Sequence, residues 1–249
     1  MNKRWLLAGV ALLAVLLVGG GVALWLRHPL PASQPGAEAD ALARRMQTAV
    51  DMEAWARTGA VRWSFQGRDE VLWDRTRNLA RVRRGNEEVL LDLERQTGLA
   101  WYHGELQEGD KREEAVQRAY GTFVNDAFWL NPMEKFFDPG VERSLAADGS
   151  LVVHFTRGGV TPGDRYQFFP GPDGKPRAWR MWVSIFLVGG IEATWTDWRR
   201  LVTGAMVCTR HSIGGVVTVP VDHVDGRATL RELVGERDPF DHLVNQATE

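Results

Sequence analysis

The sequence has a single cysteine, Cys208, in 249 residues. One thiol cannot form an intramolecular disulfide, and no cysteine follows the N-terminal apolar run to carry a lipid. The fold must therefore be stabilised by its hydrophobic core. A lack of disulfides is compatible with a bacterial periplasm but does not by itself establish that location.

Sequence motifs for catalysis are also missing. Serine is scarce and no G-x-S-x-G occurs, so acyl transfer from a nucleophile elbow has no support. The glycine pairs at 158–159 and 214–215 lack the following lysine or helix start of a phosphate-binding loop. Cys208 stands near His211, but strand alternation places the two on opposite faces, which favours a buried structural thiol. We predict no catalytic residues and no cofactor.

The histidines suggest no metal site. His223 has Asp222 and Asp225 nearby, but their spacing matches neither HExxH nor another known ligand signature. We therefore predict no metal and interpret the histidines of the strand-like runs as structural or exposed. They are His103, His154, His211 and His223.

The overall charge does not suggest nucleic-acid binding, since the formal net charge is −2. A local run of arginines alternates with strand residues and is followed by Glu87 and Glu88. Its members are Arg75, Arg77, Arg81, Arg83 and Arg84. We interpret this run as a solvated strand face, with a binding patch as the alternative.

An uncharged N-terminal run, residues 5–26, follows Lys3 and Arg4. At about 1.5 Å per residue it reaches roughly 33 Å as a helix, enough to cross a bilayer core. A cleavable signal usually has an apolar region of only about 7–15 residues, which favours an uncleaved anchor although residues 37–39 could serve as a cleavage site. The preceding positive charges predict a cytoplasmic N-terminus.

Three parts are therefore predicted. Residues 1–27 form a membrane anchor or signal sequence, residues 28–36 a proline-rich linker, and residues 37–249 an extracytoplasmic domain. The predicted location is the inner (cytoplasmic) membrane, crossed once, with the C-terminal domain in the periplasm or outside the cell.

Helical periodicity marks three segments of the domain. Residues 37–57 predict a helix with one buried face, and residues 111–145 predict helices inserted between runs of strands. Within that insert, Asn131, Pro132 and Glu134 predict the capped start of a second helix. The segment "HLVNQ" predicts a short helix in the C-terminal tail.

Strand-like runs fill most of the remaining sequence. An antiparallel meander is predicted from Gly59, and strands resume at "LVVHF". The segment "RAWRMWVSIFLVGGIEATWTDWRRL" predicts two strands joined by a two-residue turn at Gly189 and Gly190, because paired glycines adopt the positive φ of a tight hairpin. Large rings and charges occur on both faces of these strands, unlike an ordinary half-exposed sheet.

The order of these segments resembles a known family. An amphipathic helix precedes "VLWDRTRNLARVRRGNEEVLLDLERQTGLAWYHG", helices are inserted, and long strands end in "TWTDWRRLVTGAMVCTRHSI". This arrangement resembles the LolA-like superfamily of bacterial lipoprotein carriers and related lipid-binding lipoproteins, over about residues 37–225. The lipoprotein carrier itself diffuses freely, whereas this chain carries a predicted anchor.

The resemblance implies an α+β fold: a strongly curved antiparallel sheet (an incomplete β-barrel) covered by helices, here with one N-terminal transmembrane helix. It also implies a hydrophobic cavity for acyl chains between sheet and helices. Strand parity and the helical insert give the cavity residues that we predict. They are Trp63, Phe65, Leu72, Trp101, Phe128, Trp129, Phe136, Trp182, Phe186 and Trp195.

Three functions remain open on the sequence. The first is a non-enzymatic, membrane-tethered domain that binds lipid or an acylated lipoprotein, with the cytoplasmic membrane as a second partner through residues 5–26. The second is a structural or interaction module of the envelope, with a filled aromatic core and a protein partner. The third is a glycan-directed enzyme using acids such as Glu192 and Asp197, which alternation places on opposite faces.

Overall fold

The computed structural model describes residues 28–185 and 188–246. Among these residues, no helix is long and apolar enough to cross a membrane. The predicted anchor, residues 1–27, lies outside them. Part of the predicted linker forms the short strand β1 (Ser33–Pro35), which pairs with β8.

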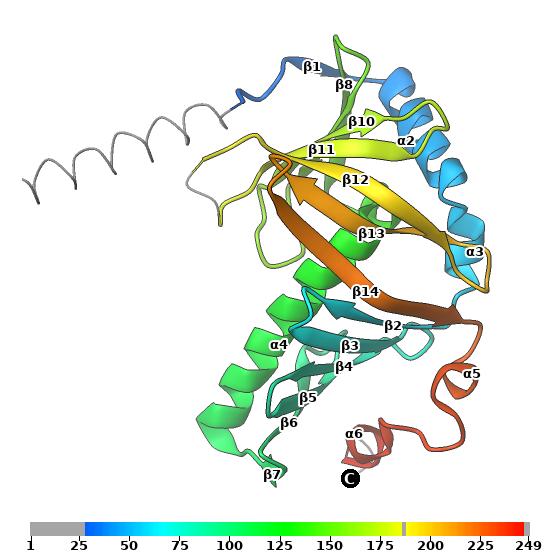
Figure 1. Ribbon diagram of the computed structural model, residues 1–249. Coiled ribbons are helices and arrows are strands. Elements are labelled where there is room, and N and C mark those ends of the chain that lie inside the picture. Colours follow the sequence, from blue (N-terminus) through cyan, green and yellow to red (C-terminus); the bar gives the residue numbers. More distant parts are fainter. Residues whose placement is uncertain (1–27, 186–187, 247–249) are drawn as a thin grey trace, which may run out of the picture.

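One antiparallel sheet of 14 strands dominates the described part of the chain (Figure 1). Its strands lie in the order β1-β8-β9-β10-β11-β12-β13-β14-β2-β3-β4-β5-β6-β7, so β14 joins two meanders and β1 and β7 are the edges. The strands after β1 are β2 (Ala60–Phe65), β3 (Asp69–Asp74), β4 (Leu79–Arg84), β5 (Glu87–Asp92), β6 (Thr97–Tyr102), β7 (Glu105–Leu106), β8 (Val141–Ala146), β9 (Leu151–Phe155), β10 (Arg165–Pro170), β11 (Pro176–Trp182), β12 (Ile191–Arg200), β13 (Met206–Ile213) and β14 (Val217–Arg227). The α+β class is confirmed, and the sheet is open.

Helices form within the segments where periodicity predicts them, but the helix at Leu230–Val234 was not predicted, and strand β8 occupies the end of the predicted helical insert 111–145. The helices are α2 (Ala37–Ala49), α3 (Met52–Ala56), α4 (Gly109–Leu130), the 3₁₀ helix η1 (Pro132–Lys135), α5 (Leu230–Val234) and α6 (Asp241–Gln246). Two helices also differ in detail. The predicted helix 37–57 is interrupted because Asp51 adopts φ 55° and caps α3, accepting from the Ala54 N–H at 2.9 Å. The predicted second helix is one 3₁₀ turn, and Glu134 bonds to Arg75 rather than to the helix start.

The predicted hairpin between residues 177 and 201 is confirmed, but its two-residue turn is wrong. β11 and β12 pair from Met181 opposite Ile191, and residues 183–190 connect them. Val183 leaves the sheet because Ser184 donates its N–H to the Asp164 carboxylate at 2.9 Å, which draws the chain toward the β9–β10 connection.

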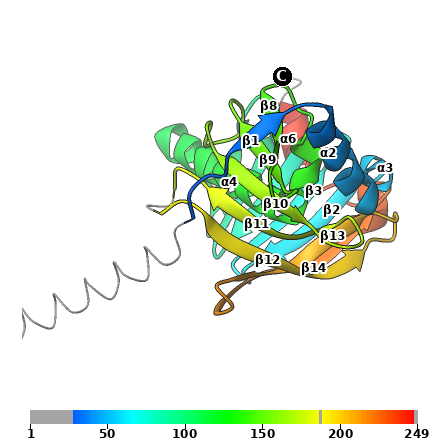
Figure 2. The same ribbon diagram turned by 90° about the horizontal axis from the view of Figure 1, so that it is seen from above.

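The two faces of the sheet are covered differently. The inner face, which carries Trp63, Trp179 and Trp195, packs beneath α2, α3, α4 and η1. In the view from above, the strands curve beneath α2 and α4 (Figure 2). The outer face of β2–β6 carries alternate residues such as Leu72 and Leu90, and α5 and α6 pack there. Both faces therefore hold large apolar side chains.

Helix α4 carries a buried acid where it meets β3 and β4. Asp126 is almost wholly buried; one carboxylate oxygen accepts from the Asn125 amide at 3.0 Å, and the other meets no partner in the described residues. Nearby Asp69 is buried and bonded by Arg68 and Arg84. Burial raises the pKa of Asp126 to about 7; the hydrogen bond from Asn125 opposes this rise and the charge of Asp69 adds to it.

This raised pKa makes stability fall as pH rises. Below about pH 4, Asp126 is protonated in both the folded and the unfolded state. Between about pH 4 and 7 it ionises only in the unfolded chain, so the free energy of unfolding decreases as pH rises. Above about pH 7 it is ionised in both states, and the decrease is complete. We expect Asp126→Asn to stabilise the fold by on the order of 2–4 kcal/mol near pH 8 and by less near pH 5.

Urea denaturation followed by tryptophan emission at both pH values measures this effect. Glu113→Gln, at an exposed acid of the same helix, is the matched control and should change little at either pH. An Asp126→Asn effect of equal size at both pH values would contradict the assignment.

Candidate functional site

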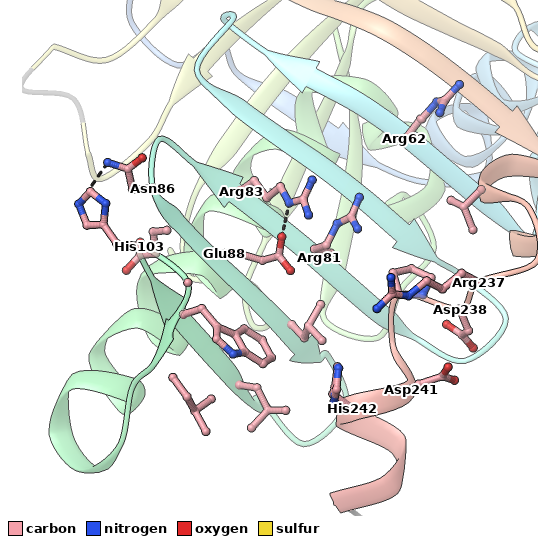
Figure 3. Close-up of a pocket in the computed structure, with 18 of the residues that line it drawn as sticks. Arg62, Arg81, Arg83, Asn86, Glu88, His103, Arg237, Asp238, Asp241 and His242 are labelled. Atoms are coloured by element: carbon pink, nitrogen blue, oxygen red, sulfur yellow. Dashed lines mark hydrogen bonds and ion pairs between the residues drawn. The ribbon is translucent and has the colours of Figure 1, made fainter.

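A groove of about 1350 Å³ lies between the outer face of β2–β6 and the C-terminal arm, residues 230–246 (Figure 3). The sheet forms its floor, and α5, the following turn and α6 form one wall. Its volume exceeds the roughly 300–1,000 Å³ of ordinary small-molecule pockets. We take this groove as the candidate binding site.

Strand register explains the floor. One row of side chains crosses the sheet from Arg62 through Leu72, Arg81 and Leu90 to Leu99. The next row runs through Arg83, Glu88, Trp101 and Leu106. Because alternate residues of a strand share a face, these rows place basic side chains on β2 and β4, and apolar side chains together with Glu88 on β5 and β6. The floor is thus cationic on one side and apolar on the other.

The wall is held by a buried ring and an ion pair. Phe240 is fully buried against the outer-face cluster that includes Leu72, Leu79 and Leu90. Arg77 reaches the Asp238 carboxylate at 2.6 Å, and its guanidinium lies 5.6 Å from the centre of the Phe240 ring. The pKa of Asp238 is lowered chiefly by this hydrogen bond. These contacts fix the arm beside the sheet.

Most charges around the groove are already paired. Glu88 is bound by Arg83, Glu87 by Arg118 at 2.8 Å, and Arg62 lies 3.3 Å from Asp225. Arg81 differs, because within the described residues it makes no hydrogen bond or ion pair.

The unpaired Arg81 guanidinium is also partly dehydrated. It is half-buried, and burial lowers its pKa, with the charge of Arg83 acting in the same direction. The group remains charged near neutral pH because an arginine pKa starts above 12. The charges of Glu88 and Glu70 act on Arg81 from a distance, but neither carboxylate bonds to it. A partly buried guanidinium whose N–H groups have no acceptor favours the binding of an anion beside it.

Six of the ten predicted cavity residues lie on or against the inner face: Trp63, Phe65, Phe128, Trp129, Phe136 and Trp195. Their rings pack on other rings. Trp129 lies 4.8 Å from Trp179, and Trp179 lies 5.0 Å from Trp195, between ring centres. Their place in the structure is that of a packed aromatic core, and a cavity-lining role for them stays a prediction.

Three other predicted residues lie on the opposite face, so the set does not share one surface. Leu72 and Trp101 belong to the outer-face rows, and Trp101 lines the groove. Trp182 lies two residues after Arg180 on β11 and therefore shares its face, away from Trp179. Its indole N–H donates to the His28 carbonyl at 2.9 Å. Phe186 lies outside the described residues. A face assigned without knowledge of the pairing is easily reversed, since successive side chains alternate.

The inner core contains polar atoms without partners in the described residues. They include both ring nitrogens of His211 and the indole nitrogens of Trp179 and Trp195. Burial lowers the pKa of His211 to about 3, and the backbone of Trp129 acts in the opposite direction. His211 is therefore neutral at physiological pH, packed edge-on against Trp195 at 4.9 Å.

The remaining reactive groups are accounted for by structural contacts. Cys208 is buried, its thiol lies 3.0 Å from the Thr196 carbonyl, and burial raises its pKa to about 12. Glu192 accepts from Arg180 at 2.8 Å and Asp197 from the Thr209 hydroxyl at 2.7 Å. Within the described residues, no three His, Cys, Asp or Glu side chains gather as metal ligands.

Sequence reasoning missed most of the groove. The sequence favours a solvated face for Arg81 and Arg83, with a binding patch as the alternative, and the arm residues Arg237 and His242 carry no signal of a site. The alternation of Arg81 with Val82 beside the apolar Leu90 and Leu99 could have indicated a mixed floor. The arm could not have been placed, because its position depends on contacts distant in sequence.

Comparison with known proteins gives one structural match to report. No protein-family model matches the chain, and a search of curated proteins finds no match. Among solved structures it is similar to a LolA superfamily protein from Nitrosomonas europaea, with a TM-score of 0.32 and 10% identity, covering 78% of this chain and 98% of the other. This match and the sequence resemblance name the same superfamily. The function below is argued from this chain's own residues.

The packing of the arm can be tested with Phe240→Ala. Removing a buried ring costs about 3–5 kcal/mol, and we expect that loss to detach the arm before it unfolds the sheet. Each loss of about 1.4 kcal/mol from the free energy that holds the arm to the sheet raises the population of chains with a detached arm about tenfold. Trypsin should therefore cut after Arg237 at least about tenfold faster.

Asp241→Asn, at an exposed residue of α6, is the control and should leave the rate of cleavage unchanged. Equal rates in Phe240→Ala and the unaltered chain would mean that the ring does not hold the wall.

Proposed function

We propose that this protein is a non-enzymatic, membrane-tethered domain that binds lipid or an acylated lipoprotein outside the cytoplasm. The groove on the outer face is the observation that carries the proposal. The tether is the uncharged run of residues 5–26, with the described domain on the extracytoplasmic side.

The floor and wall suit a long apolar chain. Trp101 and the exposed Leu106 from the sheet line the groove, and the buried Leu90, Leu99 and Leu233 lie at its base. Burying an acyl chain is worth about 0.8 kcal/mol per methylene, so affinity can arise without a dense set of hydrogen bonds. The length of the groove along β4–β6 would then hold the tail.

Arg81 gives the site a preference for an anionic headgroup. Its guanidinium lines the groove beside Leu90, and the two carboxylates of β5 form their ion pairs with other arginines, Glu88 with Arg83 and Glu87 with Arg118. A carboxylate or phosphate can accept two parallel hydrogen bonds from one guanidinium. The same ligand would thus place its charge at Arg81 and its chain over the apolar side of the floor.

The packed inner face favours a second candidate, an envelope module that binds a protein. The aromatic side chains beneath α4 fill that side of the sheet as core, so the groove would then accept an apolar segment of a partner. Labelling by a lipid probe separates the two candidates.

We predict that a photoactivatable fatty acid, supplied to membranes that contain the full chain, will crosslink to residues 87–106 and 230–242. Arg81→Met should lower this crosslinking by about tenfold or more, because a hydrogen bond to a charged group contributes about 1.5–3 kcal/mol. Mass spectrometry of the crosslinked peptides measures both results.

Arg199→Met, at an exposed arginine of β12, is the matched control and should have no effect. A photoactivatable fatty alcohol should crosslink equally to Arg81→Met and to the unaltered chain, since it has no anion. Crosslinks confined to other regions would contradict lipid binding in the groove and favour the module.

A further inference from the structure

Three connections lie at one end of the β8–β14 half of the sheet. They are residues 156–164 between β9 and β10, 183–190 between β11 and β12, and 214–216 between β13 and β14. Because neighbouring strands are antiparallel and paired in register, these alternate connections must leave from the same end. Figure 1 shows the β11–β12 and β13–β14 connections together on one side of the molecule.

Each connection exposes a branched aliphatic side chain, and the first residue of β14 exposes another. Val160 is 48% exposed, Ile185 66%, Val216 88% and Val217 55%. Single exposed apolar residues are ordinary, but the same feature on three adjacent connections marks an interaction surface. We name these four residues the apolar tips.

The connections that bear most of these tips carry no charge. Residues 183–190 read "VSIFLVGG" and residues 213–217 read "IGGVV". At the opposite end, the β10–β11 connection carries Asp173 and Lys175 as an ion pair, whereas the β12–β13 connection is uncharged and exposes Val202. An uncharged connection can move from water into an apolar environment without dehydrating an ion. The same transfer of a charged turn costs much more free energy.

The described chain begins at this same end. The His28 N–H donates to the Gly189 carbonyl at 3.3 Å, and the His28 carbonyl accepts from the Trp182 indole at 2.9 Å. Gly190 has φ 83°, and a Cβ there would lie 2.3 Å from the His28 carbonyl oxygen. The close approach of the two backbones thus requires glycine, and it holds residue 28 beside the β11–β12 connection.

We propose that the apolar tips rest in the interfacial layer of a lipid bilayer. The uncharged run of residues 5–26 ends within two residues of His28, so a chain tethered by that run presents this end to the membrane. The proposal uses the tether but not the groove, and it holds whatever the groove binds. It fixes the orientation of the domain, with the tips toward the lipid.

The test compares two cysteines in the full chain, Val216→Cys and Val202→Cys. Val202 is 72% exposed in the β12–β13 connection at the opposite end, so it is a matched control. Cys208 is buried, so we expect it not to react with a thiol dye in the folded protein. Each variant is labelled with an environment-sensitive fluorophore and reconstituted in vesicles of phosphatidylcholine and phosphatidylglycerol, with and without spin-labelled lipid.

The label at position 216 should shift its emission to shorter wavelength on reconstitution and be quenched several-fold by spin-labelled lipid, while the label at 202 does neither. Equal behaviour of the two labels overturns the proposal. A blue shift at 216 without quenching by lipid also overturns it, since it indicates a protein contact. Unaltered tryptophan emission checks that both variants are folded.

Alkaline washing of the same vesicles separates this proposal from the tether. If the protein stays with the vesicles after the wash but the label at position 216 is not quenched, docking of the tips is overturned and the tether is supported. Chain that fails to sediment with the vesicles contradicts both. Crosslinking in the groove is measured on the unlabelled chain, so its failure is distinguishable from either result.

Discussion

Alternation of side chains in a sheet whose β2–β6 part is covered on both faces is the constraint on which the rest of the structure depends. Trp63 packs beneath α4 while its neighbour Arg62 borders the groove, and Leu91 is core while Leu90 is floor. If a strand shifted its register by one residue, its core side chains would point to the groove and its groove side chains to the core. The aromatic packing of the inner face therefore sets which residues form the groove.

The sequence was sufficient for features with a local cause. Periodicity indicated α2, α4 and the strands, and the hairpin between β11 and β12 was found from its residues. It was insufficient where contacts distant in sequence decide. Asp51 interrupts a continuous helical pattern by capping α3, and the contact of Ser184 with Asp164 lengthens a connection that glycines alone would have made tight. The same limit applied to the site, because Trp101 and Trp195 look alike in sequence yet occupy opposite faces.

The groove and the apolar tips belong to different halves of the sheet. The groove lies over β2–β6, whereas the tips extend from the connections of β9–β14, and Figure 1 shows these halves at different heights in the molecule. Recognition of an amphiphile and orientation on a bilayer would therefore depend on separate residues. Arg81 can change without affecting the tips, and Val216 without affecting the groove.

The position of β14 has a consequence for how the chain reaches its native state. β2 pairs with β3 nearby in sequence, but its other edge pairs with β14, where Phe65 lies opposite Val221 and Ala60 opposite Arg227. During synthesis, the edge of β2 stays unpaired until β14 has been made, because the β2–β14 contact joins residues far apart in sequence. An unpaired strand edge can pair with a wrong partner, so misassembly is possible during this time. Newly synthesised chains should consequently be the ones that need a chaperone, and completion of the β14 pairing should be the slow step of folding.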